Sequence, residues 1–299
     1  MPILKIGMVS DGWVGDADKV DGFHASQTPA PNTIPVANNT GKLAADWLQA
    51  LLSFNQVEFT TSGSWVVPSG VSRIIIFACA GGGGGGGGSS SKKHGAGGGG
   101  SGACVINFLC DVISGETIDV TIGSGGSGGV GANNGGDGGD TIISGSISGV
   151  LVRLEGGKGG SSSSLNVGGY GGFTVTMTIS DETYIIGDGV GGILGNVFLN
   201  GARGGNGGPY GTAPRPGFSG YMFFGRFNGG DGGSTSGSNS GGGGGGASWW
   251  GPGGNGGNGG SHGDNAMYYG AGGGGAGGGY GIGDRNGGAG GSGFVRILY

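Results

Sequence analysis

The feature that most constrains the fold is a series of glycine runs. Eight consecutive glycines, residues 81–88, begin the series, and many later runs repeat every three residues as Gly-Gly-x, such as GGDGGD from Gly135. A three-residue repeat fits the polyproline-II conformation, a left-handed helix with three residues per turn and no internal hydrogen bonds. Its backbone groups must therefore find partners on neighbouring segments. The repeat predicts a bundle of polyglycine-II helices.

The residue types between the glycines predict which helices lie inside the bundle. An interior helix has neighbours on every side, so only a hydrogen atom fits at all three positions of the turn. An outer helix can direct one position in three to solvent. We therefore expect the pure glycine runs 81–88, 241–246 and 272–275 to be central. The x positions should lie on the surface, among them Asp137, Lys158, Tyr170, Asn206, Asp231 and Asn255.

Two other structures are typical of glycine-rich chains. Collagen needs one glycine per triplet and abundant proline, whereas this chain has 90 glycines and 9 prolines. A flexible, disordered chain is the second alternative. Each glycine in regular structure costs about 0.5–1 kcal/mol relative to alanine, so order requires that nearly all of these glycines be hydrogen-bonded. Apolar, strand-like segments interrupt the glycines at intervals, and they favour order.

Composition limits the partners and the compartment. Charged residues make up 10% of the chain and the net charge is −5, which offers no basic surface for nucleic acid. No apolar run reaches the ~20 residues of a membrane-spanning helix, and the N-terminus lacks the apolar region of a signal peptide. We expect a protein made in a cytoplasm. The cysteines are Cys79, Cys104 and Cys110; buried free thiols are the expectation, with a Cys104–Cys110 bridge as the alternative.

Residues 1–55 differ in composition from the rest and form a separate predicted domain. The segment from Asp16, DADKVDGFHAS, resembles the DADxVDGxHAS element of bacteriophage tail-fibre proteins, where it lies in an intertwined trimeric shaft. His24 within it has no second ligand nearby, so a structural role is favoured over a metal site. The segment that follows, GKLAADWLQALLSF, carries leucines and Trp47 at helical spacing. A helix this short and apolar should pack against copies of itself or against the base of the glycine domain. The segment therefore predicts a short helix at a trimer axis.

Residues 56–299 form the second predicted domain. Alternating apolar residues in 57–59, 65–67 and 73–80 predict strands that feed into the first glycine run. This text resembles the FxxxGxWxVPxGV opening of glycine-rich domains at the ends of phage tail fibres, which also close on a strand, as GGAGGSGFVRILY from Gly287 does. The alternation of glycine motifs and inserts is similar to that of T-even-like phage adhesins. The expected fold class is mostly β and irregular, with a β-strand base, a polyglycine-II bundle and the short N-terminal helix.

The number of glycine runs predicts which inserts share an end of the bundle. Twelve runs can be counted: 81–88, 95–102, 123–129, 135–139, 156–160, 168–172, 204–208, 229–233, 241–246, 253–260, 271–279 and 287–292. If each run crosses the bundle once, the inserts alternate between the two ends. The strand-like inserts 103–122, 140–155 and 173–200 then share the strand end, and by parity so do 234–240 and 261–270. The opposite end should present 89–94, 130–134, 161–167, 209–228, 247–252 and 280–286.

The loops expected at the opposite end are rich in aromatic residues and arginine, which dominate binding hot spots. A local apolar cluster that holds its own loop together is the alternative for Phe223 and its neighbour Phe224. The predicted receptor-binding residues are Lys92, Lys93, His94, Asn133, Tyr210, Arg215, Phe218, Tyr221, Phe223, Arg226, Trp249, Trp250, Tyr280 and Arg285.

Catalytic chemistry is not indicated. The three histidines are scattered, the carboxylates are sparse, and GxGxxG patterns arise from composition alone. We expect no enzymatic activity, no cofactor and no metal. The leading hypothesis is the receptor-binding tip of a phage tail fibre in the virion. Its expected partners are a bacterial outer-membrane protein or polysaccharide, two further copies of the chain and an upstream fibre or baseplate protein. The alternatives are an ice-binding or structural glycine-rich protein and a capsule-degrading fibre.

Overall fold

The chain divides into two units, Met1–Asn55 and Gln56–Tyr299. The computed structural model describes residues 19–20, 23–27, 30, 33–37, 40–43, 55–164, 175–179, 182–186, 191–193, 196–199, 202–209 and 228–299. In the first unit, β1 (Lys19–Val20) pairs antiparallel with β2 (Phe23–Ser26), which pairs parallel with β3 (Thr33–Pro35). Most of the predicted N-terminal helix, residues 44–54, lies outside the described residues.

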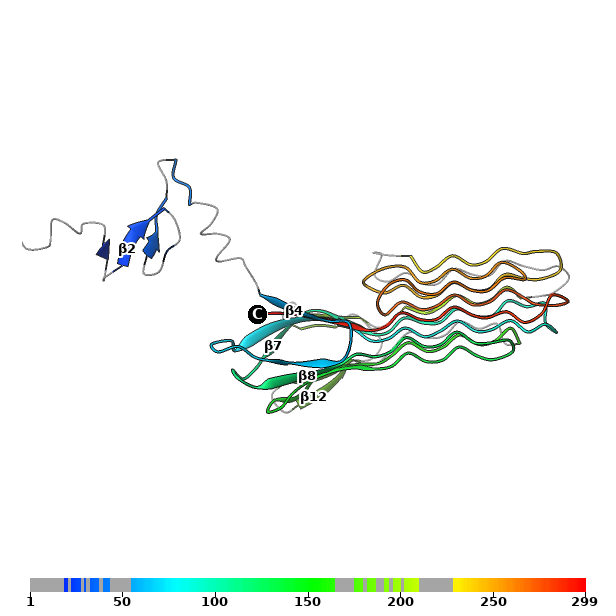
Figure 1. The fold of residues 1–299 in the computed structure, drawn as a ribbon, viewed down its shortest axis with the longest axis horizontal. Coiled ribbons are helices and arrows are strands. Elements are labelled where there is room, and N and C mark those ends of the chain that lie inside the picture. The colour runs from blue at the N-terminus through cyan, green and yellow to red at the C-terminus, as the bar shows by residue number, and fades with distance from the viewer. Residues whose placement is uncertain are drawn as a thin grey trace, which may run out of the picture. The chain divides into compact units, whose positions relative to one another are not determined.

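Two six-stranded sheets form the base of the second unit (Figure 1). One has the order β12-β11-β10-β9-β8-β5 and the other β13-β14-β7-β6-β15-β4. The strands are β4 (Gln56–Phe59), β5 (Gly63–Val66), β6 (Arg73–Cys79), β7 (Cys104–Asp111), β8 (Thr117–Thr121), β9 (Thr141–Gly145), β10 (Gly149–Leu154), β11 (Val175–Ile179), β12 (Glu182–Ile186), β13 (Gly191–Ile193), β14 (Asn196–Leu199) and β15 (Phe294–Leu298).

The core of this base lies between the two sheets. Alternate residues along β6 and β8 are buried, as expected for strands with one face on a core. Ile76 and Phe108 from one sheet belong to the same buried cluster as Ile118, Val152 and Leu154 from the other. The C-terminal strand β15 lies between β4 and β6, so the chain enters and leaves the glycine region from the same sheet.

The glycine runs leave the base side by side as long, undulating segments (Figure 1). We call each laterally bonded run a glycine rod, the end at the sheets the near end, and the opposite end the far end. Over most of their length the rods are not β-strands. Their backbone groups bond between rods: the N–H of Gly84 donates to the carbonyl of Gly136 at 2.9 Å, and that of Gly85 to Gly288 at 2.8 Å.

The bonding of rod 81–88 repeats every three residues. The N–H groups of Gly81, Gly84 and Gly87 all donate to the segment 133–139, whereas the next residues in each triplet donate to 285–291 and then to 97–100. The carbonyls of successive residues in each triplet accept from 157–163, then from 126–129, and then from 273–276. Six neighbours therefore surround this rod, three antiparallel ones accepting and three parallel ones donating.

Burial follows the predicted division between inside and outside. Every residue of 81–88, 241–246 and 272–275 is buried, whereas Asp137, Asn206, Asp231 and Asn255 are exposed and Lys158 is half-buried. Tyr170 and the run 168–172 lie outside the described residues. The described part of the chain is mostly β and irregular and contains no helix. The strands expected around the glycine runs are confirmed.

Surface side chains complete the bonding at the outside of the bundle. The Oδ1 of Asp137 accepts the N–H of Gly159 at 2.8 Å, and one turn away the Oδ1 of Asn134 accepts the N–H of Ser162 at 2.8 Å. On another face, the Oδ1 of Asn255 accepts the N–H of Asp231 at 2.9 Å. Outer rods lack a further rod on the solvent side, so these x-position side chains supply the missing acceptors.

The predicted alternation of ends is wrong after rod 204–208. This rod ends at the far end, because the carbonyl of Gly208 accepts the N–H of Gly95, the residue that directly follows the far-end loop 89–94. Rod 241–246 runs from the far end to the near end, because Gly243 donates to Ala96 and Gly246 donates to Gly99. Rod 229–233 starts at the near end, since Gly230 donates to Gly245. The chain therefore changes ends between Pro209 and Asn228, and the segment 209–228 does not connect two rods at one end as expected.

A second uncounted crossing lies at 261–268. Ser261 accepts from Gly277 at the far end, and Tyr268 accepts from Ala271 at the near end. The sequence here, SHGDNAMY, contains one glycine, and most of its residues are exposed. An outer position explains why side chains are tolerated. The earlier crossing places the insert 234–240 at the far end and 247–252 at the near end, the reverse of the expectation. The crossing at 261–268 restores the expected far-end position of 280–286.

Candidate functional site

The far end of the bundle joins loops from distant parts of the sequence. The loop 89–94 contacts 280–286 through the N–H of Ser90, which donates to the Asp284 carboxylate at 2.6 Å. It contacts 234–240 through the N–H of Ser240, which donates to the carbonyl of Lys93 at 2.8 Å. Further along, the N–H of Ser89 donates to the Ser163 hydroxyl at 3.1 Å. Together these loops form one surface, the far-end surface.

Arg285 fixes the conformation of the loop 280–286. Its guanidinium donates to the carbonyls of Gly260, Asp284 and Ile282, and its backbone forms a bridge with Gly88. Gly281 and Gly283 have positive φ angles of 75° and 89°, which favour glycine. Because its donors are occupied by the loop, Arg285 holds the surface in shape rather than offering a free cation to a receptor.

Lys93 and Tyr280 form the clearest recognition feature at this end. The Nζ of Lys93 lies 4.9 Å from the centroid of the Tyr280 ring, a cation–π distance. Tyr280 is 51% exposed. Of the two residues that flank Lys93 in sequence, Lys92 is exposed and His94 is half-buried. An exposed aromatic ring with an ammonium group over it suits a ligand that combines an apolar or sugar-ring face with polar groups.

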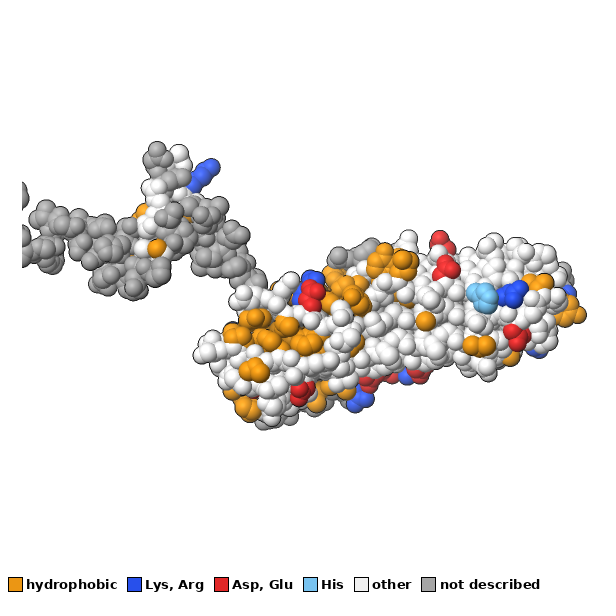
Figure 2. All heavy atoms as spheres, in the orientation of Figure 1, with side chains coloured by type: hydrophobic (Ala, Val, Ile, Leu, Met, Phe, Trp, Pro, Cys, Tyr) orange, Lys and Arg blue, Asp and Glu red, His pale blue; other side chains and the backbone are white. Residues whose placement is uncertain are grey.

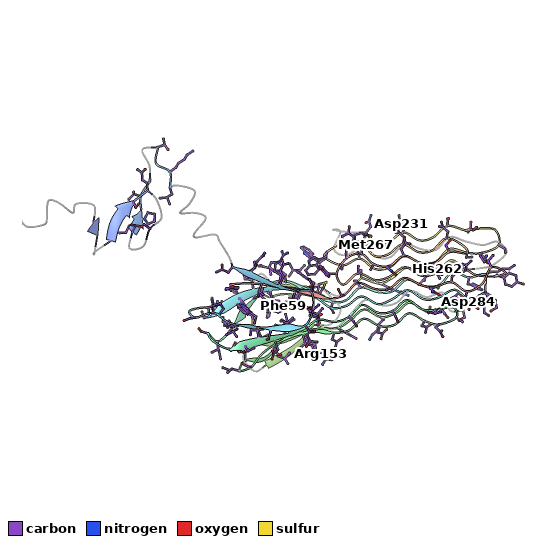
Figure 3. All side chains as sticks on the ribbon, in the orientation of Figure 1. Phe59, Arg153, Asp231, His262, Met267 and Asp284 are labelled. Atoms are coloured by element: carbon purple, nitrogen blue, oxygen red, sulfur yellow. The ribbon has the colours of Figure 1, made fainter. Side chains whose placement is uncertain are left out.

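The electrostatics of this surface depend on Asp284. The hydrogen bonds from Ser90 hold the pKa of its carboxyl below the usual range. The carboxylate thus stays charged, and the adjoining loop 89–94 carries Lys92 and Lys93. The far-end surface therefore carries both signs of charge within a few loops, rather than a uniform basic patch. Figure 3 labels Asp284 at this end of the molecule.

Asn133 has a local structural role. Its Nδ2 donates to the carbonyl of Val130 at 2.9 Å, which closes the turn between two rods. Val130 itself is 60% exposed and Ile282 is 48% exposed. The sequence prediction omitted these two apolar residues because it selected aromatic and charged types. Their position in short inserts at glycine-run ends was the available signal.

Trp249 and Trp250 do not belong to the far-end surface, so their predicted position is wrong. Both pack at the near end against the cluster that contains Phe294, and the Trp250 and Phe294 ring centroids are 5.4 Å apart. The uncounted change of ends between rods 204–208 and 229–233 reverses the end to which their loop belongs. The other predicted residues, Tyr210, Arg215, Phe218, Tyr221, Phe223 and Arg226, lie outside the described residues.

A shallow groove of about 340 Å³ lies on the side of the bundle. Asp231, Asn255 and His262 line it together with glycines, and Figure 3 labels two of them. The Asn255 amide bridges Asp231 and Asp264, and the Nδ1 of His262 accepts the N–H of Asn286 at 2.8 Å. These side chains serve the bonding between outer rods, so we assign the groove no ligand.

Within the described ranges, no group of three or more His, Cys, Asp and Glu side chains is arranged to hold a metal ion. The part of the chain that the structure describes also has no helix of the length and hydropathy needed to span a bilayer. Hydrophobic side chains gather on the base in Figure 2, with smaller clusters along the bundle.

Comparison with protein families matches residues 58–299 to the model of a glycine-rich domain. The match begins in β4 and ends at the C-terminal residue, so it contains both sheets and all the described rods. No curated protein matches the sequence.

Proposed function

We propose that this chain, which belongs to the glycine-rich domain family, is a non-enzymatic receptor-binding protein at the tip of a bacteriophage tail fibre. The far-end surface would bind the bacterial cell surface. The resemblance of the opening strands and of the DADKVDGFHAS segment to tail-fibre proteins supports the assignment. The family match itself covers the glycine-rich domain alone.

We further infer that the rods are polyglycine-II helices. The three-residue period of the bonds made by rod 81–88 supports this, as do its six neighbours. Among the described glycines, the positive φ angles fall at turns and rod ends, such as Gly131, Gly260 and Gly270, and not within the rods. Left-handed threefold helices with negative φ and lateral bonds account for all three observations.

The observation that carries the functional proposal is the convergence of loops on a fixed support. The loops 89–94, 234–240 and 280–286 are separated by long stretches of sequence, yet they are hydrogen-bonded to one another at the ends of bonded rods. Loops held at both ends lose little conformational entropy on binding. This favours an adhesin over an ice-binding protein, whose face should be regular, whereas these loops differ in sequence and charge.

The proposed protein assembles with copies of itself and with the rest of the fibre. The shaft-like segment near Asp16 and the apolar residues around Trp47 support a homotrimer that joins an upstream fibre or baseplate protein. Three copies would present three far-end surfaces, and avidity would strengthen weak single contacts. The receptor would be an outer-membrane protein or a polysaccharide.

The test measures binding of the purified full chain to a panel of bacterial strains, including mutants that lack single outer-membrane proteins or surface sugars. Lys92→Ala combined with Tyr280→Ala should reduce binding at least about tenfold, because aromatic anchors dominate interfaces. Arg73→Ala removes a cation from the base, where its side chain is 66% exposed, and should leave binding unchanged. Equal binding by all three proteins would contradict the proposal. Release of sugars from host polysaccharide would favour the capsule-degrading alternative, and thermal hysteresis the ice-binding one.

A further inference from the structure

Two cysteines face each other where the base meets the glycine rods. Cys79 is the last residue of β6 and Cys104 the first of β7, and the two are directly opposite in the antiparallel register. The N–H of Ala80 donates to the carbonyl of Ala103 at 2.9 Å. Because this bond joins the residues next to the cysteines, Cys79 and Cys104 form a non-hydrogen-bonded pair. In antiparallel sheets the Cα atoms of such a pair lie closer together than those of a hydrogen-bonded pair.

The spacing of such a pair suits a disulfide. The Cα atoms of a non-hydrogen-bonded pair lie about 4.5 Å apart, and disulfides span Cα separations of about 4.4–6.8 Å. Both cysteines are free and fully buried. Because they are direct partners in the register, their side chains lie on the same face of the sheet, side by side, in the reduced protein.

Cys110 provides an internal comparison. It lies on the same strand as Cys104, but its partner across the sheet is Ile74 on β6. It is also buried and free. The register therefore selects one pair from the three cysteines, and it is not the Cys104–Cys110 pair that the sequence left open.

We propose that Cys79 and Cys104 form an intramolecular disulfide site that a low-molecular-weight disulfide oxidises. In the first exchange, a protein thiolate attacks oxidised glutathione, forms a mixed disulfide and releases one glutathione thiolate. In the second, the other protein thiolate attacks the protein sulfur of that mixed disulfide and releases the second glutathione. Two protein thiols lose their protons and two electrons, and one oxidised glutathione becomes two reduced glutathione molecules.

Burial controls how fast this reaction occurs. Desolvation by burial, together with the neighbouring Cys104, raises the pKa of the Cys79 thiol well above its usual value. The thiolate is the reactive form, so the folded protein reacts slowly and remains reduced in a reducing cytoplasm. Oxidation requires a transient opening of the β6–β7 pair that exposes the thiols. It also requires an oxidising medium.

The position of the bridge gives it a mechanical consequence. The chain between Cys79 and Cys104 contains the rods 81–88 and 95–102 and the far-end loop with Lys92. A disulfide would close this segment at its base, next to Phe294 and Gly270. It would restrict the unfolded chain and so raise stability. The inference concerns the fold and does not depend on the proposed adhesin function.

The experiment incubates the purified full chain with oxidised glutathione, unfolds it, and blocks free thiols with iodoacetamide before mass spectrometry. One blocked cysteine, Cys110, and a cross-linked peptide pair containing Cys79 and Cys104 are expected; a parallel sample treated with dithiothreitol should show all three cysteines blocked. The oxidised protein should melt about 5–10 °C higher than the reduced one.

Serine variants separate the proposal from its alternatives. Cys110→Ser should form the same bridge, whereas Cys79→Ser and Cys104→Ser should not, and their melting temperature should not respond to the oxidant. Three blocked cysteines after oxidation, a bridge to Cys110, or a glutathione adduct without a bridge would each overturn the proposal. So would a bridged protein that melts below the reduced one, because its geometry would then be strained.

Discussion

A Cβ atom built on Gly85 would lie 2.0 Å from the carbonyl oxygen of Gly274 on the parallel neighbouring rod. The same carbonyl lies on a rod that donates to rod 81–88 from both Gly273 and Ala276. Relief of the clash would therefore require two hydrogen-bonded rods to separate. The distance explains why rod 81–88 contains only glycine.

The first prediction is that Gly85→Ala destabilises the protein severely. Overpacking usually costs about 1–3 kcal/mol, and a backbone obstacle at this distance should exceed that range. Gly136→Ala is the matched control on an outer rod, where the nearest atom to the new Cβ is the movable Oγ of Ser127 at 3.0 Å. Thermal unfolding of the two variants measures the difference. Similar melting temperatures would mean that the rods are not tightly packed around Gly85.

A second prediction concerns the acceptors at the surface of the bundle. Asp137→Ala removes both the acceptor of the Gly159 N–H and the ion pair with Lys158 at 3.2 Å. Asp137→Asn keeps an oxygen acceptor and loses only the charge. Because one hydrogen bond contributes about 0.5–1.5 kcal/mol and an exposed ion pair less, the alanine variant should be the less stable of the two. Urea denaturation compares them, and equal stability would show that water replaces the Asp137 oxygen.

Sequence reasoning succeeded where a pattern had one physical solution. The pure glycine run 81–88 had to be central because no side chain fits there, and the alternating residues of Arg73–Cys79 had to form a half-buried strand. It failed at 261–268, where a rod contains His262, Asp264 and Met267 instead of repeated glycines. An outer rod has a free side, so its sequence need not repeat, and the glycine count therefore missed this crossing.

The same limit applies to roles of single residues. Asn255 and Asp137 were expected to be simple surface residues, yet both accept backbone N–H groups from adjacent rods. Arg285 was expected to face a receptor, but the carbonyls around it use its donors. These roles depend on which rods are neighbours, and the neighbours depend on the crossing order. The pairing of Cys79 with Cys104 likewise required the strand register.

The third prediction is an acid-sensitive contribution from Glu116, a buried carboxylate in the base. Burial alone would raise the pKa of this carboxyl, but hydrogen bonds from Ile113, Ser148 and Ile147 outweigh burial and hold the pKa below the usual value. The N–H of Ile113 donates to it at 2.7 Å, and the Ser148 hydroxyl at 2.9 Å. The carboxylate thus ties together the loops that precede β8 and β10.

A carboxyl whose pKa is lower in the folded state contributes stability above its unfolded pKa, about 4.3. That contribution is lost as the pH falls through the folded value. Glu116→Gln should therefore reduce stability at pH 7 and flatten the loss of stability between about pH 5 and pH 3. Urea midpoints across this range measure the effect. A parallel pH profile in the variant would show that Glu116 does not titrate on unfolding.

The last prediction separates the two ends of the bundle with two aromatic residues. Trp250 packs edge-on to Phe294 at the near end, so Trp250→Ala should cost about 2 kcal/mol of stability and leave bacterial binding by the folded protein unchanged. Tyr280 is half exposed at the far end and contacts Lys93, so Tyr280→Ala should leave the melting temperature nearly unchanged and weaken binding. Thermal unfolding and cell binding are measured on both variants at a temperature where each is folded. If Trp250→Ala weakens binding while Tyr280→Ala does not, recognition lies at the near end and the far-end surface is not the receptor site.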